Sequence, residues 1–178
     1  MAPSLASERA TVQNPLVAYA AEIGWHHLPH EMALTLRQGT GGTLLYSVLR
    51  DKLIALNPGV VTAESAEQII ARLESVRTNI EGNAEILAWL RGERSVFVEA
   101  EKRQRNVTVI DFDHAANNTF HVTDEWEYTN GQHTNRADVM FVVNGVPVVA
   151  DGTITGDLPG TVLRSGTDTD TVPVPAGP

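Results

Sequence analysis

Carboxylate and imidazole side chains recur in this sequence at spacings that could hold a metal ion. Asp138 opens an apolar stretch, where it could be a metal ligand or could form a surface pair with Arg136. Asp111 and Asp113 flank Phe112, so on a strand both carboxylates would share one face. That pair could be a two-carboxylate metal site or an acidic pair beside a turn.

Two other motifs are possible ligand sites. His26, His27 and His30 are close enough for a zinc site with neutral imidazole ligands, although no fourth ligand has a suitable spacing. An exposed loop between helices is the alternative setting for these histidines. The glycine-rich stretch 38–42 lacks a following Gly-Lys-Ser/Thr and a preceding strand, so we interpret it as a flexible linker without ATP binding.

The charge balance limits any role in nucleic-acid binding. The chain has 13 basic and 22 acidic residues, a formal charge of −9, which argues against a free-standing nucleic-acid binder. A nuclease whose DNA is delivered by another domain stays possible. The densest basic stretch, 102–105, could contact a DNA backbone, but Glu99 and Glu101 beside it favour a solvated hairpin connection.

The remaining composition indicates one globular domain. A length of 178 residues and a hydrophobic content of 42% suffice for a proper core. The absence of cysteine rules out disulfides and thiolate metal sites and fits a cytoplasmic protein. No apolar run approaches the roughly 20 residues that span a bilayer, so we expect no membrane association.

The first half of the chain is predicted to be helical. A first helix is expected to be capped by Ser7 or Thr11 and to end at Gly24, with Pro15 tolerated only if the helix begins near it. Apolar residues at helical spacing predict three more helices. These helices cover about 44–56, about 62–76 and about 83–90.

After Gly92 the pattern is that of strands. Apolar residues at 96 and 98, at 107–110, and at 120 and 122 predict strands, and two apolar stretches flank Asn144-Gly145. Asn-Gly between such stretches is a strong hairpin signal. We therefore predict an α+β (α/β) fold, a helical N-terminal half followed by a mixed β-sheet, over residues 1–155. Residues 156–178 are predicted to be a disordered tail.

Five motifs occur along the chain in a fixed order. They are Asn57-Pro58, the helix ending in Trp89-Leu90-Arg91-Gly92, Val109-Ile-Asp-Phe-Asp113, Asn117-Asn118-Thr-Phe120, and Arg136-Ala-Asp138 through Asn144-Gly145-Val-Pro147. Together they resemble the N-terminal domain of the restriction (motor) subunit of type I restriction–modification enzymes, over about residues 7–150. In that family the domain is a nuclease of the PD-(D/E)xK class, and a DNA translocase follows it in the same polypeptide.

The resemblance implies Mg²⁺-dependent hydrolysis of DNA, with Asp138 as the first catalytic metal carboxylate. Glu22 is either a further, helix-borne metal ligand or a solvated charge at the end of its helix. A Glu-x-Lys should complete the site, but its two positions hold Gly152 and Ile154. Asp151, the other candidate catalytic carboxylate, stands one residue early. On a regular strand that offset points its side chain to the opposite face unless a bulge rotates it back.

Because Glu-x-Lys is missing, we expect no cleavage by the chain alone. One hypothesis is a restriction-subunit nuclease domain that is truncated; the other is a non-catalytic module that binds DNA or a partner subunit on the same scaffold. The implied partners are DNA and the methylation and specificity subunits, and ATP belongs only to the full-length family proteins. A chain ending near residue 155 would leave strand edges uncovered, so marginal stability and self-association are expected.

Overall fold

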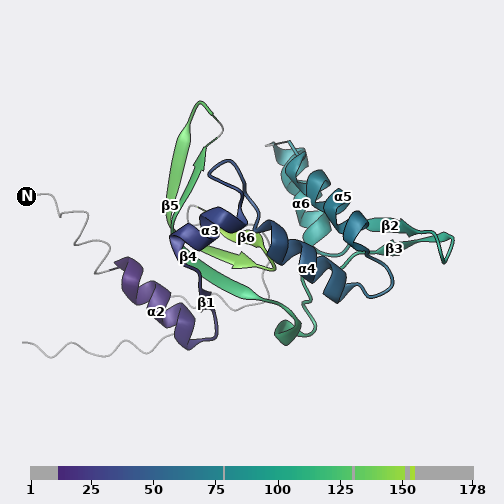
Figure 1. The fold of residues 1–178 in the computed structure, drawn as a ribbon, viewed down its shortest axis with the longest axis horizontal. Coiled ribbons are helices and arrows are strands. Elements are labelled where there is room, and N and C mark those ends of the chain that lie inside the picture. The colour runs from purple at the N-terminus through teal and green to yellow at the C-terminus, as the bar shows by residue number, and fades with distance from the viewer. Residues whose placement is uncertain (1–11, 78, 130, 151–152, 155–178) are drawn as a thin grey trace, which may run out of the picture.

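The computed structural model describes residues 12–77, 79–129, 131–150 and 153–154, and helices precede most of the strands within them (Figure 1). This arrangement is the predicted α+β fold. None of the described helices is long and apolar enough to cross a membrane. The helices are α2 (Asn14–Glu22), α3 (His30–Leu36), α4 (Tyr46–Leu56), α5 (Ala63–Glu74) and α6 (Ile80–Leu90).

A mixed sheet forms the second half of the fold. Its strand order is β1-β4-β5-β6-β7, with β1 parallel to β4 and the other neighbours antiparallel. A separate hairpin, β2–β3, lies at the other end of the molecule beside α5 and α6 (Figure 1). The strands are β1 (His26–His27), β2 (Ser95–Val98), β3 (Arg103–Asn106), β4 (Phe120–Thr129), β5 (Thr134–Val143), β6 (Val146–Ala150) and β7 (Thr153–Ile154).

Local capping explains where α5 and α6 begin. The Thr62 side chain accepts a hydrogen bond from the Ser65 N–H, and the Ser65 hydroxyl accepts one from the Thr62 N–H, which is a capping box at the predicted start. The helix α6 begins three residues before the predicted position. Asn79 caps it there, because its side chain accepts a hydrogen bond of 2.8 Å from the Gly82 N–H.

The region around the first predicted helix differs from expectation in part. The helix α2 begins at Asn14, next to Pro15 as the proline requires, while the expected caps Ser7 and Thr11 lie outside the described residues. The loop between helices, the alternative setting for the histidines, is confirmed only in part, because His26 and His27 are exposed between α2 and α3 but the segment is not a loop. His26 and His27 form β1 and His30 begins α3, because a short edge strand pairs with β4 before the chain turns into a helix.

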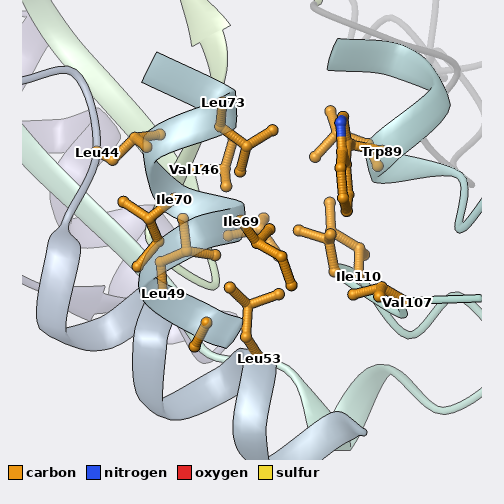
Figure 2. Close-up of a cluster of buried hydrophobic side chains, with 14 of the residues drawn as sticks. Leu44, Leu49, Leu53, Ile69, Ile70, Leu73, Trp89, Val107, Ile110 and Val146 are labelled. Atoms are coloured by element: carbon orange, nitrogen blue, oxygen red, sulfur yellow. The ribbon is translucent and has the colours of Figure 1, made fainter. Parts of the chain in front are cut away.

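The main hydrophobic core lies where α4 and α5 face α6 and the segment 107–110. Figure 2 shows Leu49 and Leu53 of α4 beside Ile69 of α5, opposite Trp89 and Ile110. All five side chains are buried. Full burial of each such side chain contributes about 1.5–3 kcal/mol, so this cluster is the main source of stability for the helical half.

The Asn144-Gly145 hairpin turn is confirmed, and it positions α4. Both residues have positive φ, 51° and 88°, as a type I′ turn demands. The Gly145 carbonyl accepts a hydrogen bond of 2.8 Å from the Leu45 N–H. A Cβ on Gly145 would lie 2.7 Å from the Leu45 oxygen and 2.8 Å from the Leu49 nitrogen. Only glycine therefore lets the start of α4 approach the turn this closely.

The predicted strand at 107–110 is wrong, although Val107 and Val109 are fully buried. Its backbone groups find partners in asparagine side chains instead of a neighbouring strand. Asn57 accepts from the Thr108 N–H at 2.7 Å and donates to the Thr108 carbonyl at 2.8 Å. Asn144 donates to the Val109 carbonyl at 2.8 Å. The strand of this region is β3, which the basic stretch 103–106 forms.

The end of the described sheet reverses direction. After β6 the chain turns back as β7, so that Val149 pairs with Ile154 and Ala150 with Thr153. Asp151 and Gly152 lie outside the described residues, as does the predicted disordered tail, 156–178.

Candidate functional site

Strand β5 changes from exposed to buried along its length, and Asp138 lies at the change. Its first three residues, Thr134 to Arg136, are exposed, whereas Met140, Val142 and Val143 are buried. Asp138 is itself exposed. Its carboxylate is therefore accessible to solvent at the border of the apolar core, a position from which it could meet a metal ion or a ligand.

A strained residue stands opposite Asp138 on β4. The register passes from the pair Asp124–Val139 to the pair Trp126–Ala137, and Glu125 between them has φ 55°. A positive φ is a strained conformation for a residue other than glycine, and such strain is common beside functional sites. The Glu125 carboxylate lies 3.0 Å from Arg136. The partner of Arg136 is thus Glu125, not Asp138 as the surface-pair alternative proposed.

The edge strand β1 brings imidazoles close to the same part of β4. His27 Nε2 lies 3.8 Å from Asp124 Oδ1, and Asp124 pairs with the residue after Asp138. The rings of His26 and His121 have centroids 6.2 Å apart. Burial, and then the charge of His26, lower the pKa of His121. The register places Glu125 opposite Asp138, whereas Asp124 and its partner His27 belong with Val139, on the other face of the sheet.

The described residues do not fit a complete metal site. Nowhere in the described ranges do three or more His, Cys, Asp or Glu side chains gather as ligands for an ion. Glu22 is exposed at the end of α2, and Asp151 lies outside these ranges. The three histidines of the suggested zinc site are divided between β1 and α3. Asp138 is left as one candidate carboxylate for Mg²⁺, fewer than a stable site requires.

Asp111 has a structural role. Its Oδ1 accepts hydrogen bonds from the N–H groups of Asp113 and His114, at 3.1 and 2.9 Å, and its Oδ2 accepts one from the Asn117 side chain. These hydrogen bonds, that from Asn117 first, lower the pKa of Asp111. Asp113 is exposed. The acidic pair therefore orders a turn, which agrees with the turn alternative over the metal site.

The basic stretch at 102–105 is matched by carboxylates. Lys102 lies 2.7 Å from Glu99, and Arg103 and Arg105 lie 2.6 and 3.0 Å from Glu101. Exposed ion pairs of this kind contribute little to stability, but the carboxylates neutralise the positive charge that would attract a DNA phosphate. This arrangement supports the solvated hairpin.

The comparison with protein families decides the identity. The model of the family described as the type I restriction enzyme R protein N terminus matches residues 6–150. The chain belongs to this family. A search of curated proteins finds no match. The family assignment confirms the resemblance, and its matched region ends immediately before Asp151, where the expected Glu-x-Lys fails to appear.

In this member of the type I restriction R-protein family, the motifs that carried the resemblance are largely buried asparagines. Asn57, Asn118 and Asn144 are at most 9% exposed. Asn57 and Asn144 hydrogen-bond to backbone groups of distant segments, and Asn118 to backbone groups of its own turn. Sequence reasoning placed Asn144 in a turn but missed this role. The available signal was an asparagine inside an otherwise apolar stretch, since a buried amide must find partners.

A buried arginine was also missed. Arg37 is 1% exposed, donates to the carbonyls of Gly42 and Glu127 at 2.8 and 2.7 Å, and stacks on the Trp126 ring at 3.8 Å. Burial lowers its pKa. The glycine-rich loop after α3 is therefore a loop as predicted, but Arg37 ties it to β4 and the term flexible linker does not describe it.

Proposed function

We propose that this chain is a nuclease-like N-terminal region of a type I restriction enzyme R subunit that does not hydrolyse DNA by itself. The observation that carries the proposal is the reversal of the chain after Ala150. Thr153 and Ile154 belong to β7, and Ile154 pairs with Val149. The position expected for the catalytic lysine thus lies beside β6, on a returning strand, and holds an isoleucine.

The family membership supports the remaining parts of the proposal. DNA is the substrate class of such a region, the methylation and specificity subunits are its partners, and a cytoplasmic restriction system is its setting. A divalent metal in this class would orient water and stabilise charge on the phosphate. Asp138 is the carboxylate that would contact it, but the described residues do not complete that site, so no catalytic step follows from them.

Plasmid cleavage tests the proposal directly. The purified chain, incubated with supercoiled plasmid and Mg²⁺ or Mn²⁺, is expected to produce no nicked or linear product. Asp138→Ala is the informative variant and Asp113→Ala the matched control, because both carboxylates are exposed but Asp113 belongs to the turn. Metal-dependent cleavage that disappears in Asp138→Ala and persists in Asp113→Ala would overturn the proposal.

A restoration experiment tests whether cleavage is absent because the Glu and Lys side chains are missing or because the backbone places their positions wrongly. The double variant Gly152→Glu/Ile154→Lys restores the expected residue types. Because position 154 belongs to the returning strand, the variant is expected to stay inactive. Cleavage by it would mean that residue identity alone limits activity and that the reversal is no obstacle.

A second candidate function is a non-catalytic contact with a partner subunit. Four apolar side chains of the first described helical segment are exposed: Val12, Tyr19 and Ile23 by 59% each and Leu16 by 38%. Their spacing places them along one stripe of the helix. Co-precipitation with the methylation and specificity subunits should be weakened by Tyr19→Glu and kept by Ala21→Glu, an exposed control on α2. Equal retention by both variants would exclude this stripe as the contact.

A further inference from the structure

A cavity of about 700 Å³ lies between α5, α6 and the start of β2. In Figure 1 these elements lie on the right of the view, whereas β5, the strand that contains Asp138, lies on the left. Cavities of several hundred Å³ are the usual size of sites for small ligands. The wall of this one includes Arg72 from α5, Arg77 from the α5–α6 connection, and Arg94 just before β2.

Two of these arginines differ from every other cation in the described ranges. Residues 12–77, 79–129, 131–150 and 153–154 contain eleven lysines and arginines, and nine of them have a hydrogen bond, an ion pair or another interaction of their own. Arg72 and Arg77 are the other two. Neither makes a side-chain hydrogen bond or ion pair to a described residue, although the charge of Arg72 contributes to the lowered pKa of Glu85. Both line the same cavity.

The carboxylates of the cavity do not cancel this charge. Glu85 is engaged by Arg94, whose Nε lies 3.0 Å from both carboxylate oxygens, and by the Trp89 indole N–H at 3.1 Å. Glu81, on the first turn of α6, is the other acidic residue of the wall. Three guanidinium groups therefore face two carboxylates, and one of those carboxylates is already paired.

The charge of the whole region differs from that of the rest of the chain. Residues 72–106 contain seven basic and six acidic residues, whereas the remainder contains six basic and sixteen acidic ones. An anion approaching this strongly acidic protein therefore meets least repulsion at the end where the cavity lies. Guanidinium groups bind phosphate oxygens bidentately, which makes phosphate the anion that suits them best.

We propose that the cavity between α5, α6 and β2 binds a phosphate group through Arg72 and Arg77, with Arg94 held in position by Glu85. The phosphate belongs either to a small phosphate compound or to a nucleic-acid backbone. The site is separate from Asp138, so it does not depend on whether the chain cleaves DNA.

Binding to two probes tests the proposal and distinguishes the sources. Pyrophosphate and a fluorescent 20-base-pair duplex are titrated into the full chain at low salt. The variant Arg72→Ala/Arg77→Ala is expected to weaken binding at least tenfold. For the duplex, loss of two phosphate contacts should reduce the slope of log Kd against the logarithm of the salt concentration by about two. Binding of both probes, of pyrophosphate only or of the duplex only identifies which phosphate source the cavity accepts.

The control variant is Arg50→Ala/Lys52→Ala, which removes the same charge from α4, where both cations already have partners. It should change either Kd by less than about twofold, and circular dichroism checks that both variants fold. If the double variant Arg72→Ala/Arg77→Ala fails to fold, the single variant at exposed Arg77 takes its place. No binding of either probe by the wild-type chain, or equal weakening by both double variants, would overturn the proposal.

Discussion

The buried side chain of Asn144 should be one of the most sensitive positions in the protein. It is 0% exposed and joins three segments. It donates to the Val109 carbonyl at 2.8 Å and to Asn118 Oδ1 at 2.7 Å, and it accepts from the Thr119 N–H at 2.8 Å. Asn144→Ala leaves at least two backbone groups buried without a partner, at a cost of about 1–3 kcal/mol each. Alanine at φ 51° adds about 1–2 kcal/mol.

The expected loss in the free energy of unfolding is therefore about 3–8 kcal/mol, a large share of the roughly 5–15 kcal/mol typical of a domain. Urea unfolding followed by tryptophan fluorescence measures it. With a slope of about 2 kcal/mol per molar, the midpoint should fall by roughly 1.5–4 M. Asn144→Gly should recover about 1 kcal/mol, because glycine tolerates positive φ. The exposed Asn83→Ala is the control and should stay within about 0.5 kcal/mol of wild type. A midpoint shift below about 0.5 M for Asn144→Ala would refute the reasoning.

Three further predictions follow from the same structure. Gly145→Ala should lose at least about 3 kcal/mol in urea unfolding, since its Cβ would meet the backbone of α4 and its φ is 88°; wild-type stability would contradict the close approach. Arg37→Lys should lose about 2–3 kcal/mol although charge is kept, because an ammonium cannot reproduce the forked contacts and the stacking on Trp126; a neutral effect would show that charge alone matters there. Burial, assisted by the hydrogen bond to Glu74, raises the pKa of Tyr46 to about 12. The stability that the protonated Tyr46 side chain contributes is therefore complete below about pH 10 and is lost as pH rises toward 12. Ultraviolet titration should show a late phenolate transition that Tyr46→Phe removes, and an unchanged titration of that variant would exclude the assignment.

The elements that could be predicted from the sequence are those with local causes. The α5 start follows from Thr62 and Ser65, and the hairpin turn follows from the tolerance of Asn144 and Gly145 for positive φ. The end of α4 follows from Asn57-Pro58, which cannot continue a helix. Each of these signals acts within a few residues and needs no knowledge of the rest of the chain.

The errors arose where distant segments decide the outcome. Residues 107–110 have the composition of a strand, but the side chains of Asn57 and Asn144 take the backbone hydrogen bonds that a neighbouring strand would need. His26 and His27 become a strand only because the edge of β4 is available to them. The surroundings of Asp138 could not be predicted for the same reason, since the register of β4 and β5 places Glu125 opposite it.

The family signature and the catalytic signature depend on different kinds of residue. The buried Asn144 links Val109, Thr119 and the hairpin turn, and its loss would cost several kcal/mol. An exposed carboxylate such as Asp138 contributes little to folding, so its partners can be absent while the fold persists. Family membership over residues 6–150 therefore follows from folding constraints and carries no guarantee of cleavage. In this chain the region that matches the family ends at Ala150, where the sheet turns back as β7, and the Glu-x-Lys of the catalytic site does not follow.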